Sequence, residues 1–190
     1  MKKRNKKKVL FIDRDGTLIK EVPPDYQVDT FEKLEFYPGI FEYMRKIAMN
    51  LNFELVMVSN QDGMGTPSFP EAAFWPVQNF VIKSFENEGV QFSKIFIDRS
   101  FISDNNPSRK PGTGMLTEYL NNPEYDIKNS FVIGDRITDM QLAKNLRCKG
   151  IWLKNNEQLG ATEIKDPAAL NKTIILATPD WKKIYGFLKK

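Results

Sequence analysis

The sequence predicts an α/β fold in which a mainly parallel, Rossmann-like sheet has helices on both faces. Two observations support this prediction. Short apolar runs alternate with longer amphipathic stretches over most of the 190 residues, and neither an internal repeat nor a low-complexity linker interrupts the alternation. Short, nearly continuous apolar runs are typical of strands buried on both faces. A helix between two such strands makes them parallel neighbours in one sheet.

In the first half of the chain, residues 8–12 are predicted as a strand because four apolar residues follow one another there. Residues 41–49 are predicted as a helix, since their apolar side chains recur at three- and four-residue spacings. Residues 53–58 are mostly apolar and are predicted as the next strand. Helical spacing returns over residues 71–88, and residues 94–97 are the third predicted strand.

The second half of the chain repeats this pattern. By the same criteria, the predicted elements are a helix at 115–120, a strand at 130–133, a helix at 137–146, a strand at 150–153, a further candidate strand at 174–177 and a helix at 180–188. Two polar loops rich in Pro, Asp and Asn, at 20–38 and 99–111, are too long for simple turns. We expect them to be functional loops beside a site.

Composition and charge narrow the classes of function. Apolar residues are 41% and charged residues 27% of the chain, which suits a folded core. Six of the 28 basic residues lie in the first eight positions, so the rest of the chain holds 22 basic and 24 acidic residues. We therefore expect a basic tail at 1–8 and a single domain at 9–190. A slightly acidic body argues against nucleic acid as a partner.

The absence of histidine restricts the chemistry. Because the chain has no histidine and one cysteine, Cys148, it can have no intramolecular disulfide, no cysteine–histidine zinc site and no histidine-based mechanism. No apolar run is long enough for a signal-peptide core or a membrane span, so we expect a cytoplasmic protein without a membrane partner.

Polar side chains follow the predicted strands where each strand ends. Asp13 and Asp15 follow the first strand, Ser59 the second and Asp135 the fourth, while Lys110 precedes the predicted 115–120 helix. In a parallel sheet, ligands bind beyond the carboxyl ends of the strands, so these groups should converge on one crevice. Three carboxylates, a hydroxyl and a lysine there indicate a magnesium-dependent phosphoryl-transfer site.

Charge assigns a role to each group. A carboxylate nucleophile repels a phosphate monoester, and Mg²⁺ bound by Asp13 and Asp135 would bridge the two. Ser59 and Lys110 would hold the phosphoryl oxygens. Asp13 would attack phosphorus to give an aspartyl-phosphate. Asp15, on the same side of an extended chain, would protonate the departing alkoxide and later deprotonate water.

The motifs resemble the four motifs of the haloacid dehalogenase superfamily of phosphatases. They are Asp13-x-Asp15-Gly-Thr17, Ser59-Asn60, Lys110-Pro111 and Gly134-Asp135-x₃-Asp139, in that order. The resemblance implies that Asp13 is nucleophile and metal ligand, that the Asp15 carbonyl also binds Mg²⁺, that Ser59, Asn60 and Lys110 bind phosphate, and that Asp135 is a metal ligand. Asp139 is either a support for the metal site or an acid at a helix N-terminus.

A closer resemblance is to the histidinol-phosphate phosphatase domains of bifunctional histidine-biosynthesis proteins. It depends on residues 11–19, 24–29, 33–39, 59–66, 68–70 and 134–139. It implies hydrolysis of L-histidinol phosphate to L-histidinol, beside a fused imidazoleglycerol-phosphate dehydratase domain. The alternatives are a heptose-bisphosphate phosphatase, another small phosphomonoester phosphatase, a polynucleotide 3′-phosphatase, or a non-catalytic scaffold for the dehydratase.

Many relatives in that family hold zinc in a cysteine- and histidine-rich loop before the lysine motif. This chain has Asp98, Ser100, Asn106 and Ser108 in the corresponding loop. None of these residues offers a thiolate or an imidazole, so we expect no zinc there. We expect the loop to be held by Pro107 and by local Asx-type hydrogen bonds from Asp104 to Asn106 instead.

The spacing of the motifs leaves no room for a cap domain. The gap after the first motif is about twenty residues, and the gap after the second is mostly one predicted helix. An open site favours a small phosphorylated metabolite. By resemblance to the family's substrate loop, Glu21 and Gln27 are the first candidates to bind the ammonium and imidazole groups of histidinol phosphate. Arg136 is either a further substrate contact or an exposed ion-pair partner.

Overall fold

The computed structural model describes residues 6–21, 23, 26–153 and 167–190 of the chain. Within these residues the strands form one six-stranded sheet in the order β3-β2-β1-β4-β5-β6, and all neighbouring strands are parallel. The strands are β1 (Lys8–Ile12), β2 (Phe53–Asn60), β3 (Lys94–Asp98), β4 (Phe131–Gly134), β5 (Lys149–Trp152) and β6 (Ile174–Ala177). The predicted parallel sheet is therefore confirmed, including the strand at 174–177.

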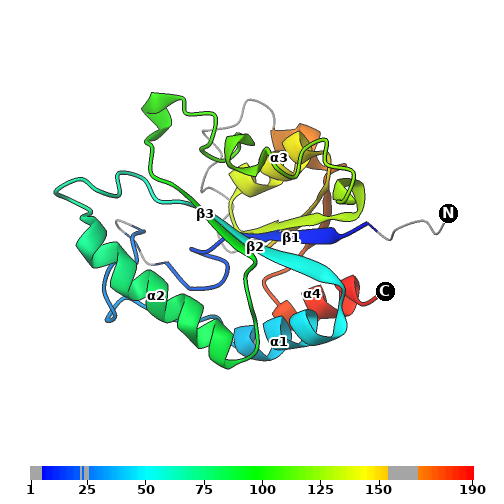
Figure 1. Cartoon of the computed structure of the whole chain (residues 1–190), viewed down its shortest axis with the longest axis horizontal. Helices are drawn as coiled ribbons and strands as arrows, with labels where there is room; N and C mark the ends of the chain where they lie inside the picture. Colours follow the sequence, from blue (N-terminus) through cyan, green and yellow to red (C-terminus); the bar gives the residue numbers. More distant parts are fainter. Residues whose placement is uncertain (1–5, 22, 24–25, 154–166) are drawn as a thin grey trace.

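Helices cover both faces of this sheet. They are α1 (Ile40–Asn50), α2 (Glu71–Asn87), α3 (Ile137–Leu146) and α4 (Trp181–Leu188), with 3₁₀ turns η1 (Ile102–Asp104), η2 (Gly114–Leu116), η3 (Ile127–Asn129) and η5 (Pro167–Leu170). Figure 1 shows α1, α2 and α4 on one side of the sheet and α3 on the other.

Alternate side chains of β1 build a separate core on each side of the sheet. Leu10 and Ile12 pack with residues of α1, α2 and α4, whereas Val9 and Phe11 pack with residues of α3. A strand buried on both faces must be apolar at its buried positions, which explains the continuous run at 9–12. The centre of the sheet, where β1 lies between β2 and β4, is thus packed on both faces.

The predicted helix at 115–120 is wrong. Only Gly114–Leu116 forms a 3₁₀ turn, and the following residues form turns whose hydrogen bonds also span three residues, such as Tyr119 N to Leu116 O (3.0 Å). Leu116 and Tyr119 are both fully buried against the sheet. A segment this short is not long enough for a stable helix, so packing of these two side chains decides its geometry.

The last residues of the predicted basic tail pair with the rest of the chain. Lys8 begins β1, and Lys7 makes two backbone hydrogen bonds, donating to Glu124 O (2.8 Å) and accepting from Asp126 N (2.7 Å). The division into a tail at 1–8 and a single domain at 9–190 stays a prediction. Residues 1–5 of the predicted tail lie outside the described residues.

The two loops where a cap domain would be inserted contain only small local structure. In the described residues, the segment from β1 to α1 has turns and isolated bridges such as Ile19 to Phe36, and the segment from β2 to α2 has turns and the Thr66–Phe69 bridge. Among the described residues, no helix combines the length and the apolar character needed to cross a membrane.

We expect Phe85→Ala on α2 to lower the free energy of unfolding by about 3–5 kcal/mol, because it empties a fully buried aromatic site. Urea unfolding measures this change. Phe80→Ala on the same helix is the matched control: Phe80 is 49% exposed, and its loss should change the free energy by about 1 kcal/mol or less. Equal effects of the two substitutions would contradict the packing described here.

Candidate active site

The candidate active site lies where the strand order of the sheet reverses. Strand β1 has β2 on one side and β4 on the other, so the loops after β1 and β4 leave the sheet in different directions. Asp13 follows β1 and Asp135 follows β4, and the Asp13 amide donates a hydrogen bond to Ile133 O (2.9 Å). The backbone thus holds the ends of the two strands together.

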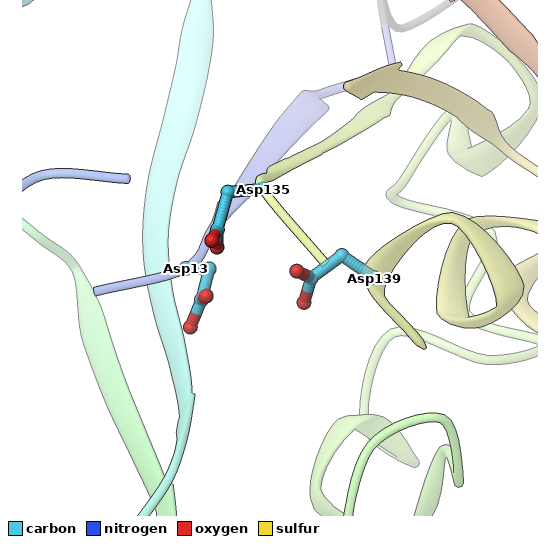
Figure 2. A group of neighbouring side chains, drawn as sticks. All are labelled: Asp13, Asp135 and Asp139. Carbon is cyan, nitrogen blue, oxygen red and sulfur yellow. The ribbon is translucent and has the colours of Figure 1, made fainter. Parts of the chain in front are cut away.

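Three carboxylates meet at this point. One oxygen from each of Asp13, Asp135 and Asp139 lies within 4.8 Å of the others, and all three side chains are buried. Figure 2 shows the three carboxyl groups turned toward a common space, with Asp139 projecting from α3. The Asp139 Oδ2 atom also accepts a hydrogen bond from Arg136 N (3.1 Å) and caps α3. Asp139 therefore caps the helix and also belongs to the carboxylate cluster, and its support of a metal site stays a prediction.

Two glycines make room for these carboxylates. A Cβ atom at Gly16 would overlap the Asp135 carboxylate, and one at Gly134 would overlap the Asp139 carboxylate. Gly16 also has a φ of +70°, which side chains of L-residues rarely adopt. The space that the carboxylates need therefore explains why glycine occupies positions 16 and 134.

Lys110 crosses to the cluster from the loop before η2. Its Nζ donates to Asp13 Oδ1 (2.6 Å) and to Asp139 Oδ1 (2.8 Å). Asn60 determines where Lys110 lies, since Asn60 Oδ1 accepts from Lys110 N (2.9 Å) and Asn60 Nδ2 donates to Lys110 O (3.0 Å). The Asn60 side chain, predicted to bind phosphate, is thus used to hold the Lys110 backbone.

Burial shifts the pKa values of the cluster. Loss of solvent raises the pKa of Asp13 to about 7, although the Lys110 ammonium acts in the opposite direction. Burial, together with the charges of Asp13 and Glu21, raises the pKa of Asp135 well above its usual range. Burial lowers the pKa of Lys110, but Asp13 and Asp139 more than offset this and leave it above its ordinary value. Negative charge in the cluster thus exceeds what one ammonium neutralises.

The donor set fits a hard cation. The cluster offers only carboxylate oxygens, which Mg²⁺ and Ca²⁺ prefer to nitrogen or sulfur ligands. A divalent ion beside Asp13 and Asp135 would favour their ionised forms, which burial disfavours. Thr17 supports this arrangement by donating from Oγ1 to Asp135 Oδ1 (3.4 Å).

Asp15 and Ser59 are brought together by a residue to which the sequence analysis assigned no role. Gln61 donates from Nε2 to both Asp15 Oδ2 and Ser59 Oγ. Arg14, also without an assigned role, is fully buried and donates to Asp15 Oδ1 (2.6 Å). The alternation of side chains along a strand does place Gln61 on the same side as Ser59, which was the available signal.

A pocket of about 190 Å³ opens beside Asp13 and Asp15. The predicted substrate residues Glu21, Gln27 and Arg136 line it. Arg136 Nη2 donates to Glu21 Oε2 (3.0 Å), and burial raises the pKa of Glu21 to about 7 despite this partner. The ion pair means that Arg136 is both a pocket residue and a partner of Glu21.

Other pocket residues were not predicted from the sequence. Tyr26 and Phe69 add aromatic surface, and Arg109 forms an ion pair with Asp62. The position of Arg109 next to Lys110 in the sequence was a signal for its role, because both belong to the loop that enters the site. Arg109 and Arg136, which both line the pocket, are therefore each paired with a carboxylate.

The loop at residues 98–108, which replaces the zinc-binding loop of many relatives, is held by local hydrogen bonds. Asp98 Oδ1 accepts from Ser100 N (2.9 Å), and Asn106 Oδ1 accepts from Ser108 N (2.9 Å). Asp104 Oδ2 also accepts from Phe101 N (2.9 Å), so Asp104 and Asn106 both form local hydrogen bonds in the predicted stretch. The expectation that the loop binds no zinc stays a prediction.

Comparison with known proteins defines the class. A family model described as HAD-hydrolase-like matches residues 107–177. A crystal structure of D,D-heptose 1,7-bisphosphate phosphatase from B. bronchiseptica, complexed with magnesium and phosphate, has the same fold: its TM-score is 0.77 and its identity 19%, over 96% of this chain and 97% of that chain. Over residues 107–177 the chain is thus similar to hydrolases of the haloacid dehalogenase type, and its fold is that of this phosphatase structure.

The chain is also similar to curated proteins named histidine biosynthesis bifunctional protein HisB. The protein from Bacteroides fragilis is 54% identical over 96% of this chain, and that from Spirosoma linguale is 51% identical over 96%. The chain spans 48% of the length of each of these relatives. The predicted family resemblance is thus confirmed.

We expect Mg²⁺ to stabilise the chain more strongly at pH 8 than at pH 6. Without a cation, burial raises the pKa of Asp13 to about 7 in the folded chain. The protonated carboxyl group therefore stabilises the folded state at about pH 4, and this contribution is lost as the pH rises to about 7. Protons compete with Mg²⁺ for Asp13, so the apparent Kd should be about tenfold higher at pH 6 than at pH 8. Thermal unfolding in a Mg²⁺ titration at both pH values measures this.

At ten times its Kd, Mg²⁺ should add about 1.4 kcal/mol to the free energy of unfolding. Asp135→Asn is the control for this titration, because it removes a charge from the cluster without changing the size of the side chain. An equal Mg²⁺ effect in this variant would contradict the assignment of the cation site.

Proposed function

We propose that this chain is a Mg²⁺-dependent phosphatase that hydrolyses L-histidinol phosphate to L-histidinol and phosphate. The observation that supports the phosphatase chemistry most strongly is the contact of Lys110 with Asp13 and Asp139 within the carboxylate cluster. This arrangement puts a nucleophile, an anion-binding ammonium and a candidate cation site within one buried space.

The reaction has two steps. In the first, a carboxylate oxygen of Asp13 forms a bond to phosphorus while the ester P–O bond breaks, and Asp15 donates a proton to the departing alkoxide. In the second, Asp15 takes a proton from water, which attacks phosphorus and releases Asp13. Lys110 and Ser59 hold the phosphoryl oxygens. A bound Mg²⁺ would reduce the repulsion between Asp13 and the phosphate dianion.

The pocket supports a substrate with a positively charged end. The side chain of Glu21 is buried beside the site, and its carboxylate forms an ion pair with the half-buried Arg136. The ammonium group of histidinol phosphate would add a second cation to Glu21, and Tyr26 and Phe69 offer apolar contact to an imidazole ring. The similarity to proteins named for histidine biosynthesis supports the same substrate class.

A bisphosphate is less well accommodated. Arg109 and Arg136, the arginines that line the pocket in the described residues, are paired with Asp62 and Glu21. A second phosphate would compete with Asp62 or Glu21 for these arginines, and separating Arg136 from Glu21 would leave a buried carboxylate uncompensated. This ranks a heptose bisphosphate below a monophosphate.

The curated relatives are named as bifunctional and are about twice as long as this chain. Their length supports the proposal that the phosphatase region acts beside a second domain, for which we propose the dehydratase activity implied by the family resemblance. A cytoplasmic location stays a prediction.

Phosphate release across a substrate panel tests the proposed function. With Mg²⁺, kcat/KM should be highest for L-histidinol phosphate, lower for D-glycero-D-manno-heptose 1,7-bisphosphate and lowest for a 3′-phosphorylated oligonucleotide. Asp13→Asn keeps the size of the side chain and should abolish turnover with all three, because it removes the nucleophile. Turnover by Asp13→Asn would reject the mechanism, and a non-catalytic scaffold would show no turnover in the unsubstituted chain.

Glu21→Gln should raise KM for L-histidinol phosphate by about tenfold or more, which corresponds to the loss of one hydrogen bond to a charged group. The KM for p-nitrophenyl phosphate, which has no ammonium group, should hardly change. Glu35→Gln is the control, since Glu35 pairs with Lys20 and is exposed. An equal change in both KM values would show that Glu21 does not select the substrate.

A further inference from the structure

Both oxygens of the Asp15 carboxylate are held by neighbouring side chains. Asp15 Oδ1 accepts a hydrogen bond from Arg14 Nη1 (2.6 Å), and Asp15 Oδ2 accepts one from Gln61 Nε2. Asp15 is 9% exposed, Gln61 5% and Arg14 0%. Since Arg14 follows β1 and Gln61 follows β2, two separate segments of the chain determine the orientation of this carboxylate.

The Gln61 amide uses both of its hydrogens in the site. Its Nε2 atom donates to Asp15 Oδ2 and also lies 2.7 Å from Ser59 Oγ. Once Asp15 has given up its proton, the opposite orientation of the amide would put Oε1 against a carboxylate oxygen, where two acceptors would share no proton. The orientation with nitrogen toward both partners therefore suits Asp15 after proton transfer.

The contact with Gln61 leaves the Ser59 hydroxyl as a donor. A serine hydroxyl has one hydrogen and two acceptor positions, and Gln61 occupies an acceptor position. The Ser59 hydrogen is thus available for a phosphoryl oxygen. A single amide therefore connects the proposed proton donor, Asp15, with a residue proposed to hold the phosphate.

Gln61 and Arg14 are themselves held by the fold. The backbone N–H of Gln61 donates to the backbone carbonyl of Asp98 (2.7 Å) at the end of β3. Arg14 Nη2 donates to Val28 O (3.3 Å), and its guanidinium lies 5.1 Å from the centre of the Phe74 ring of α2. Because these residues are fixed before substrate binds, little reorganisation of Asp15 is needed during the reaction.

We propose that Gln61 is a positioning residue for proton transfer. It holds the Asp15 carboxyl group where the ester P–O bond breaks, so that the Asp15 proton passes to the departing alkoxide oxygen as Asp13 bonds to phosphorus. Arg14 holds the other oxygen of Asp15. This inference rests on the phosphatase function proposed above and assigns Gln61 a role that acts through Asp15.

Two substrates with the same phosphoryl group and different leaving groups test the proposal. An alkoxide needs a proton as it leaves, whereas p-nitrophenolate leaves as a stable anion. Gln61→Met keeps the length of the side chain and removes its donor. It should lower kcat/KM for L-histidinol phosphate by about 100-fold and for p-nitrophenyl phosphate by less than about fivefold. If the panel ranks another alkyl phosphate first, that substrate replaces histidinol phosphate.

Gln78→Met is the matched control. Gln78 is also a buried glutamine, 2% exposed, but it lies on α2 and donates to Met57 Sδ (3.4 Å). The same chemical change there should leave both kcat/KM values unchanged. Gln61→Glu is a second variant of similar size that places a carboxylate opposite Asp15, and it should show the same dependence on the leaving group.

The Asp15→Asn background separates positioning from a structural effect. If Gln61 acts through Asp15, adding Gln61→Met to Asp15→Asn produces no further loss that is specific to the alkyl substrate. Equal losses with both substrates in the single variants would overturn the proposal, since they would reflect phosphate binding through Ser59 or general damage. If the unsubstituted chain hydrolyses neither substrate, the phosphatase function itself fails.

Discussion

The site depends on the electrostatic balance between Lys110 and the buried carboxylates around it. Asp13, Asp135 and Asp139 lie close enough to repel one another, and a single ammonium contacts Asp13 and Asp139. Such a concentration of like charge persists in a folded protein only where the surrounding structure enforces it. Here the central strands of the sheet, the first turn of α3 and the clasp of Asn60 on the Lys110 backbone enforce it.

The fold places this charge where it is chemically useful. Strands β1 and β4 are adjacent although they are far apart in the sequence, and their carboxyl ends bring Asp13, the proposed nucleophile, and Asp135, a candidate metal ligand, together. Gly16 and Gly134 allow the backbone to approach the carboxylates more closely than any side chain would permit. The buried negative charge lowers stability when no cation is bound. A cation that binds to the cluster would remove this repulsion and so stabilise the folded chain.

The pocket beside the cluster contrasts with it, because its charges are already paired. Arg136 with Glu21, and Arg109 with Asp62, limit the net charge that a substrate meets beyond the phosphate position. The structure thus separates two parts of the site. We propose that the phosphoryl group binds at the cluster with Lys110, and that the remainder of the substrate binds in the pocket formed by the loop after β1 and the two arginines. Residues at the strand ends supply the first part, and loop residues supply the second.

Sequence patterns were enough to predict the sheet and the helices at 41–49, 71–88, 137–146 and 180–188, and to expect Asp13, Ser59, Lys110 and Asp135 at one edge of the sheet. They were enough because buried parallel strands are continuous apolar runs, and the polar residues that follow them must meet at one edge. The side-chain partnerships came from the folded structure: Asn60 holds Lys110, Gln61 joins Asp15 to Ser59, and Arg14 is buried. The folded structure also replaced the predicted helix at 115–120 with turns. These features depend on contacts between residues distant in the sequence, which spacing and composition do not encode.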